Sequence, residues 1–192
     1  MRIAALEGGF SDPPVEAAHA FRAAMSAMAR PGRIERLTGA VPPGPVSPAA
    51  GALILTLCDA DTPLCLKGGH DTPSMRDWVA FHTGAPLVPA PEAMFVLGEW
   101  PALLPLDHYR PGMPDYPDRS ATLIVELPDL AAEGAQLSGP GIRANTQLSL
   151  PEIEAFRRNA ARFPLGLDFF FTCQDRVAAL PRSTKVEAAP CM

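Results

Sequence analysis

Prolines divide this chain into short pieces and so limit the length of every helix and strand. The 23 prolines among 192 residues are more than twice the usual share of about 5%. Proline ends helices and is excluded from central strands, so this spacing predicts short elements that end abruptly and many loops. Together with 15 glycines, the prolines still fall below the share of about 25–30% that indicates disorder. We therefore expect a folded chain.

Composition and charge narrow the class of protein. Hydrophobic residues make up 47% of the chain and charged residues 19%, as in globular proteins. A net charge of −5 argues against a nucleic-acid partner, which normally requires a basic surface. The apolar part of the N-terminus is too short for a signal peptide, and no apolar run approaches the roughly 18 residues of a membrane span. A cytoplasmic protein without a membrane segment is expected.

Cysteines and histidines show no metal-binding pattern. Cys58, Cys65, Cys173 and Cys191 contain no Cys-x-x-Cys pair, and the four histidines lack zinc-ligand spacing. We expect reduced thiols and no metal.

The first predicted helix starts at Asp12, expected to cap it, with Pro13 in its first turn. Helical spacing places Phe21, Ala24, Met25 and Met28 toward the core. The stretch Arg30-Pro31-Gly32 ends the helix, because proline disfavours helical geometry in the preceding residue and glycine permits a turn.

Three more helices follow from local signals. Ser47-Pro48 opens a run over 49–61, although its LILTL segment is also compatible with a strand. Thr72-Pro73 opens a helix ended by Gly84. Its predicted inner face is Met75, Trp78, Val79 and His82. Ser149 and Glu152 resemble a capping box for a helix over 153–163, whose predicted inward residues are Ile153, Phe156, Ala160 and Phe163.

Apolar runs between these helices predict strands. They are PLCLKGG, AMFVLGEW, ATLIVEL, AQLSGPGI and LDFFFTC. The last of these is predicted to form a hairpin with VAALP. Residues 101–118 are predicted to be an ordered surface excursion. The alternation predicts a single three-layer α/β domain over 1–192 with a mixed sheet.

Candidate ligand residues gather after the first buried strand. Lys67 and His70, with Asp71, follow it directly, a common place for ligand contacts in α/β sheets. The alternative is a solvated turn in which Asp71 and Thr72 cap the next helix, and this alternative is favoured.

Two further anion-binding candidates come from arginines. Arg182, Ser183 and Thr184 combine a guanidinium with two hydroxyls, which suits a phosphate, phosphonate or carboxylate, or equally a strand edge paired with acidic neighbours. Arg30 lies at a helix C-terminus, where a purely structural role is the favoured interpretation. No Gly-x-Ser-x-Gly, His-Glu-x-x-His or Walker pattern occurs, so no catalytic residue is predicted.

Four stretches in order give the chain a resemblance to a known family. GGFSDP…AFRAAMSAMARPGRI, LSGPGI, RFPLGLDFFF and LPRSTKVE, between Gly8 and Glu187, look like the PhnH family, the H subunit of bacterial carbon–phosphorus lyase. The family commonly has Pro-Arg-Thr-Thr where this chain has Pro-Arg-Ser-Thr, and often glycine in place of Gln174.

The resemblance implies an accessory subunit without catalytic residues of its own. Such subunits act with the G, I and ATP-binding L subunits, and with J in a core complex. They form α-D-ribose 1-methylphosphonate 5-triphosphate when a phosphonate displaces the adenine of ATP. It also implies a homodimer with a fold like the large domain of pyridoxal-phosphate (PLP) transferases, without PLP or another cofactor, and a phosphonate or nucleotide as ligand. The alternatives are an autonomous PLP enzyme using Lys67 or Lys185, and a simple anion-binding module.

Overall fold

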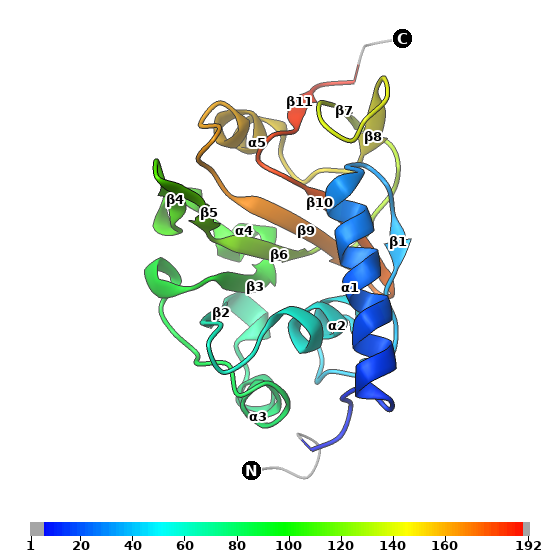
Figure 1. Ribbon diagram of the computed structural model, residues 1–192, viewed down its shortest axis with the longest axis vertical. Coiled ribbons are helices and arrows are strands. Elements are labelled where there is room, and N and C mark those ends of the chain that lie inside the picture. The colour runs from blue at the N-terminus through cyan, green and yellow to red at the C-terminus, as the bar shows by residue number, and fades with distance from the viewer. Residues whose placement is uncertain (1–5, 190–192) are drawn as a thin grey trace.

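The computed structural model describes residues 6–189 and shows an α/β architecture (Figure 1). The helices are α1 (Pro13–Ala29), α2 (Pro48–Leu57), α3 (Pro73–His82), α4 (Trp100–Leu103) and α5 (Ile153–Ala160). The strands are β1 (Glu35–Arg36), β2 (Leu64–Leu66), β3 (Phe95–Glu99), β4 (Pro111–Met113), β5 (Tyr116–Ser120), β6 (Thr122–Glu126), β7 (Ala135–Ser138), β8 (Thr146–Leu148), β9 (Asp168–Cys173), β10 (Arg176–Leu180) and β11 (Lys185–Glu187). Cys191 lies outside the described residues.

A six-stranded mixed sheet forms the centre of the fold. Its strand order is β1-β10-β9-β6-β3-β2, so β1 and β2 are the two edges. Strands β2, β3, β6 and β9 run parallel, and β10 and β1 complete the sheet in antiparallel pairs. The mixed sheet predicted from the alternating pattern is confirmed.

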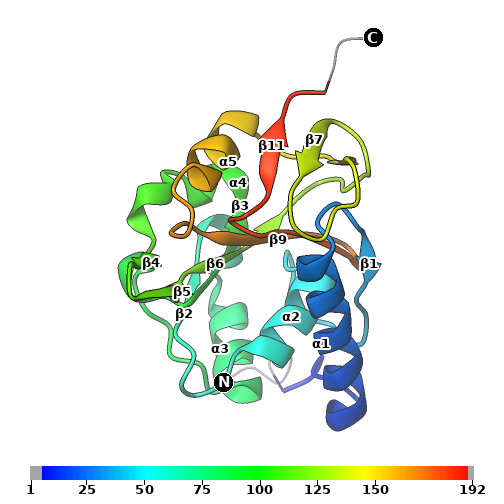
Figure 2. The ribbon, with the colours of Figure 1, turned by 45° about the horizontal axis from the view of Figure 1, so that its top comes forward.

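Helices cover both faces of this sheet, and each face has its own apolar core. Figure 2 shows α1, α2 and α3 on one side and α5 with β7 and β11 on the other. The first core combines alanines of α1 with larger apolar side chains of α2, α3 and the central strands, including Trp78 of α3. Aromatic side chains dominate the second, where Phe156 of α5 packs edge-to-face on Phe169 and Phe171 of β9.

Helix α1 buries only part of the predicted face: Ala24 is buried and Met28 is half-buried against the core, as predicted. Its buried residues are Ala20, Ala24 and Ala27, whereas Phe21 is 49% exposed and Met25 is 55% exposed. The prediction for Phe21 and Met25 was therefore wrong. Helix α1 packs against both α2 and β10, and alanine side chains permit that close approach whereas larger ones would hold the helix away.

The first turn of α1 is held by Glu16 instead of Asp12. The Asp12 side chain makes no capping hydrogen bond, which corrects the sequence prediction. The Glu16 carboxylate reaches back and accepts hydrogen bonds from the Asp12 backbone N–H at 3.0 Å and from Ser11 Oγ at 3.1 Å. The helix nevertheless begins at Pro13, as predicted.

The C-terminal end of α1 packs against a glycine turn that lies more than 100 residues further along the chain. A Cβ atom on Gly141 would lie 2.0 Å from the carbonyl oxygen of Ala29. Gly141 also has a φ of +81°, which L side chains rarely adopt. Gly32 has a φ of +87° and turns the chain into β1. The Gly-Pro-Gly turn therefore packs closely against the end of the helix.

The predicted starts of α2 and α3 are confirmed. Ser47 Oγ accepts a hydrogen bond from Ala50 N at 3.2 Å, and Thr72 Oγ1 accepts one from Met75 N at 3.1 Å. The LILTL segment is helical, and α2 ends at Leu57, four residues before the predicted limit. On α3, the predicted inner face is buried at Met75, Trp78 and Val79, while His82 is half-buried.

The predicted capping box ahead of α5 is wrong. Ser149 Oγ accepts a hydrogen bond from Ala131 N in a neighbouring loop, and Glu152 makes no capping bond. The helix ends at Ala160, so Phe163 falls beyond it and is 60% exposed. Phe156 is buried as predicted, whereas Ile153 and Ala160 are half-buried.

Short strands account for most of what the sequence did not predict. The excursion after β3 contains α4 and the hairpin of β4 and β5, and β11, β7 and β8 form a separate three-stranded sheet. The predicted hairpin of β9 and β10 is confirmed. Gln174, in the hairpin's two-residue turn, has a φ of +54° at the position where the family often has glycine.

Over residues 6–189, no helix is long and apolar enough to cross a membrane. Within the same range, no group of three potential metal ligands is found.

Candidate functional site

The carboxyl ends of the parallel strands bring polar side chains together from distant parts of the sequence. Glu99 at the end of β3 pairs in register with Glu126 at the end of β6, and Glu126 pairs with Thr172 of β9. Neighbouring strands lie about 4.8 Å apart, so these side chains are near neighbours. Ligands of open α/β sheets bind outside this edge, which makes it the first candidate for a functional site.

His70 joins the turn after β2 to the end of β3. The turn Gly68–His70 places the buried imidazole so that Nδ1 donates to Oε2 of Glu99 at 2.7 Å. The backbone N–H of Gly69 donates to the other carboxylate oxygen of Glu99 at 3.2 Å. A Cβ on Gly68 would lie 2.2 Å from this carboxylate, so glycine is needed for the close approach. The turn therefore holds Glu99 in one position.

Glu126 is held by the N-terminus of α2. The backbone N–H of Ser47, the N-cap residue, donates to Oε1 of Glu126 at 2.7 Å. Hydrogen bonding at a helix N-terminus stabilises a carboxylate. A protein carboxylate therefore occupies the place where many α/β proteins bind an external anion.

The two paired glutamates have opposite pKa shifts. Burial raises the pKa of Glu126, and its hydrogen bonds with Ser47 only partly offset this effect. Partial burial would also raise the pKa of Glu99, but hydrogen bonds from backbone N–H groups and from His70 leave its pKa below the usual value. Adjacent carboxyl groups with divergent pKa values are frequent in functional sites.

Lys67 also lies at the carboxyl end of β2, but on the opposite face of the sheet from His70. It follows β2 on the face of Cys65, whose buried thiol belongs to the core around α5. A Cβ on Gly98 of the adjacent strand would lie 3.0 Å from the Cβ of Lys67. The side chain of Lys67 lines an open cavity beside β2 with Asp71 and Arg76. Lys67 and His70 thus share a turn but face different surroundings.

Asp71 and Thr72 were predicted to cap α3, and the prediction is confirmed only for Thr72. Thr72 caps α3, whereas Asp71 binds Arg76, with Nε to Oδ1 at 2.5 Å and Nη2 to Oδ2 at 2.8 Å.

Arg182 lies at the opposite end of the parallel strands, where β9 begins. Its backbone N–H donates to Oδ1 of Asp168 at 2.8 Å, and its guanidinium pairs with both carboxylate oxygens of Asp168 and donates to the carbonyl of Pro117. The side chains of Arg182 and Asp168 are 13% and 20% exposed. This network connects β9, β10 and β5, so the guanidinium has a structural role.

The two hydroxyls after Arg182 differ in exposure. Thr184 is buried, and its Oγ1 has no hydrogen-bond partner among the described residues, while Ser183 is half-buried. Arg30 is exposed at the C-cap of α1, where its backbone N–H donates to Ser26 O at 3.0 Å. The structure does not bring Arg30 or Arg182 together with His70. Ligand binding by Arg30, Arg182, Ser183 and Thr184 stays a prediction.

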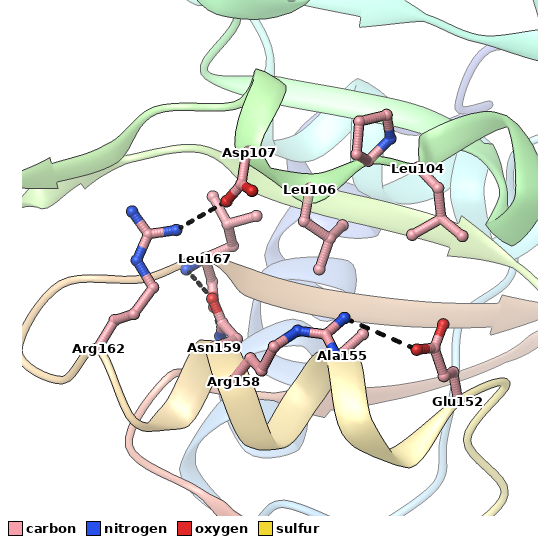
Figure 3. A pocket seen from close by; sticks show the side chains of 10 residues that line it. Leu104, Leu106, Asp107, Glu152, Ala155, Arg158, Asn159, Arg162 and Leu167 are labelled. Carbon is pink, nitrogen blue, oxygen red and sulfur yellow. Dashed lines mark hydrogen bonds and ion pairs between the residues drawn. The ribbon is translucent and has the colours of Figure 1, made fainter.

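A second cavity lies between α5 and the segment after α4 (Figure 3). It has a volume of about 530 Å³, and its lining includes the apolar residues Leu106 and Leu167. Arg162 Nη1 lies 3.4 Å from Asp107 Oδ1, and Arg158 Nη2 lies 3.8 Å from Glu152 Oε1. Each cation at the rim therefore faces a carboxylate, and the rim carries no net charge to attract an anion.

Sequence reasoning identified Lys67 and His70 but missed Glu99, Glu126 and Ser47 as the neighbours of His70. Both glutamates are single acidic residues at the ends of apolar runs, a signal that strand ends commonly share. Only the register of β3 and β6 brings the two together.

The fold and the polar groups at the carboxyl ends of its strands define an α/β protein without a recognisable catalytic motif. Comparison with known proteins identifies its family. Residues 8–187 match the family described as "Bacterial phosphonate metabolism protein (PhnH)". A relative from Rhizobium meliloti (strain 1021), the alpha-D-ribose 1-methylphosphonate 5-triphosphate synthase subunit PhnH, is 42% identical over 191 residues, covering 94% of each chain. The chain therefore belongs to the PhnH family, and the resemblance found in the sequence is confirmed.

Proposed function

We propose that this chain is a subunit of α-D-ribose 1-methylphosphonate 5-triphosphate synthase and acts in phosphonate catabolism. The observation that carries the proposal is the 42% identity to a subunit of that name over 94% of both chains. The family match over residues 8–187 supports it independently. Because identity extends across nearly the whole chain, the shared role concerns the entire fold.

The partners are the G, I and L subunits for the synthase step, with J in the wider complex. In that step the bond between C1′ of the ribose and N9 of adenine breaks, and a phosphonate oxygen forms the new bond to C1′. Adenine leaves, and the 5′-triphosphate is retained. We assign no bond-making role to this chain.

The geometry at the carboxyl edge supports an accessory role. The polar groups there are engaged with one another: His70 with Glu99, and Glu126 with Ser47. Neither of the two cavities beside β2 and α5 is lined by His70, Glu99 or Glu126. A subunit that shapes or completes a neighbour's active site does not need reactive side chains in a cavity of its own.

The chain is further proposed to be a cytoplasmic homodimer when isolated, with one domain over 1–192 and a fold related to the large domain of PLP transferases. It is proposed to work without PLP. Purified protein is expected to show no internal-aldimine absorption band, and a band lost in Lys67→Ala would contradict this part of the proposal.

Co-expression tests the proposal directly. A tagged copy of this chain is expected to co-purify with untagged G and I subunits in a fixed stoichiometry. A matched sample with the same subunits but an unrelated tagged protein controls for non-specific capture. Recovery of the tagged chain alone would contradict the proposal.

A further inference from the structure

A cavity beside β2, an edge strand of the sheet, is open to solvent and is lined by charged side chains. Its volume is about 670 Å³, within the range of 300–1,000 Å³ that is usual for small-molecule sites. The residues around it come from residues 65–76, which run from β2 into α3, from the loop 87–90 and from α4. Three stretches of chain that are separate in sequence therefore converge on one space.

One end of this cavity is cationic. Lys67 and Arg76 both line it, with Asp71 as the single acidic residue, so the charged side chains there carry a net charge of +1. Among the described residues, Lys67 has no ion-pair partner within 4.0 Å. Its ammonium group is therefore available to an anion.

Arg76, the second cation of the cavity, is held by an ion pair with Asp71. Its Nε and Nη2 atoms are bound by the two carboxylate oxygens of Asp71, at 2.5 and 2.8 Å. No described residue accepts a hydrogen bond from Nη1, so this atom can donate to a ligand while the pair with Asp71 holds the guanidinium in place. Both cations also lie near Cys65: burial raises the pKa of the Cys65 thiol, while Lys67 and Arg76 partly offset that rise.

The remaining lining residues carry no charge, and the loop 87–90 contributes Val88, Pro89 and Ala90 on one side. Most of the surface that the cavity exposes is nevertheless polar, and the Leu66 side chain belongs to the core on the opposite face of the sheet. A small inorganic anion would leave the wall formed by the loop 87–90 uncovered. The combination suits a ligand with an anionic end and an organic body that carries polar groups of its own.

We propose that this cavity binds an organic phosphate of nucleotide size, with its phosphoryl oxygens on Lys67 and Arg76 and its organic body against the loop 87–90. The choice of a phosphorus ligand rests on the proposed function, and the location rests on the cavity itself. Arg76 is thereby a ligand-binding residue that the sequence did not indicate. Lys67, predicted from the sequence as a ligand-binding residue, would act together with Arg76.

The chain offers an internal control, because Lys67 and Lys185 are its only lysines. Lys185 is exposed on β11, outside the cavity. Purified protein is acetylated with a small amine reagent, with and without ATP, and both lysines are quantified by mass spectrometry. Saturating ATP is expected to slow the acetylation of Lys67 about tenfold while Lys185 reacts at an unchanged rate. Equal rates at Lys67 with and without ATP would overturn the proposal.

Simpler ligands test which part of the molecule is recognised. Adenosine, which lacks the anion, is expected to give no protection at concentrations where ATP saturates. Methylphosphonate is expected to protect more weakly than ATP, because it leaves the wall formed by the loop 87–90 uncovered. Stronger protection by methylphosphonate than by ATP would overturn the assignment to a nucleotide-sized ligand.

Variants complete the test. Lys67→Gln and Arg76→Gln are each expected to weaken ATP binding, measured by calorimetry, about tenfold or more. Arg36→Gln is the matched control, since Arg36 is an exposed arginine on β1 at the other edge of the sheet. Equal affinities in all three variants would refute the site. Co-purification with G and I is expected to be unchanged in all of them, so failure of the site is distinguishable from failure of the proposed function.

Discussion

The Nδ1 atom of His70 lies 2.7 Å from Oε2 of Glu99 and ties the turn after β2 to the end of β3. Glu99 in turn pairs in register with Glu126, which the N-terminus of α2 holds through Ser47. Two adjacent carboxyl groups are therefore held by different elements. Their opposite pKa shifts make opposite predictions for the dependence of stability on pH.

Glu99→Gln is expected to lower stability slightly at neutral pH. The pKa of Glu99 is below its usual value in the folded chain, so its carboxylate stabilises the fold above the unfolded pKa and this contribution is lost as the pH falls through the folded value. The side chain is 40% exposed, so the loss should stay below about 1 kcal/mol. Urea unfolding at pH 7 and pH 4 should show the gap between parent and variant closing at the lower pH. A gap that widens on acidification would contradict this assignment.

Glu126→Gln is expected to show the opposite trend. The folded pKa of Glu126 is raised by burial, so its contribution is favourable below the unfolded pKa and is lost as the pH rises through the folded value. The amide oxygen of glutamine can still accept from Ser47 N. The variant should therefore gain stability relative to the parent between pH 4 and pH 7. Glu133→Gln, at an exposed loop position, is the control and should show no such trend.

Gly141→Ala is expected to destabilise the chain by about 2 kcal/mol or more, because the new Cβ would meet the Ala29 carbonyl and φ is positive. Gly69→Ala is the control, since no heavy atom lies within 4 Å of its Cβ position. Urea unfolding of both variants measures the difference. Similar free energies of unfolding would show that the turn does not fix the end of α1.

Arg182→Ala is expected to cost about 2–4 kcal/mol, because it leaves the largely buried Asp168 carboxylate without its partner. Arg162→Ala removes an exposed pair with Asp107 and should cost less than about 1 kcal/mol. Thermal unfolding of the two variants compares them. A loss for Arg182→Ala no larger than that for Arg162→Ala would mean that the ion pair does not hold β9 and β10 together.

Local signals predicted the starts of helices well, because a cap and a following proline act within a few residues. Ser47 and Thr72 both cap as expected. The inner face of α1 was mispredicted in part, because hydrophobicity favours burying Phe21 and Met25, whereas close packing on α2 and β10 selects alanine. Ser149 was misassigned because its hydroxyl has an alternative partner, Ala131 N, from a loop distant in sequence.

The candidate site was predictable only in part. Lys67 and His70 follow a recognisable buried strand, so their position at a sheet edge could be inferred. The neighbours of His70 depend on which strands pair and in what register, and the sequence alone does not determine this. The cavity partner of Lys67, Arg76, depends on the angle at which α3 leaves the turn.

The most direct measurement is synthesis of α-D-ribose 1-methylphosphonate 5-triphosphate from ATP and methylphosphonate by purified subunits, followed by phosphorus NMR. The account predicts product when the G, I and L subunits are combined with this chain, little or none when the chain is omitted, and none from the chain alone. Full activity without the chain, or turnover by the chain alone, would contradict it.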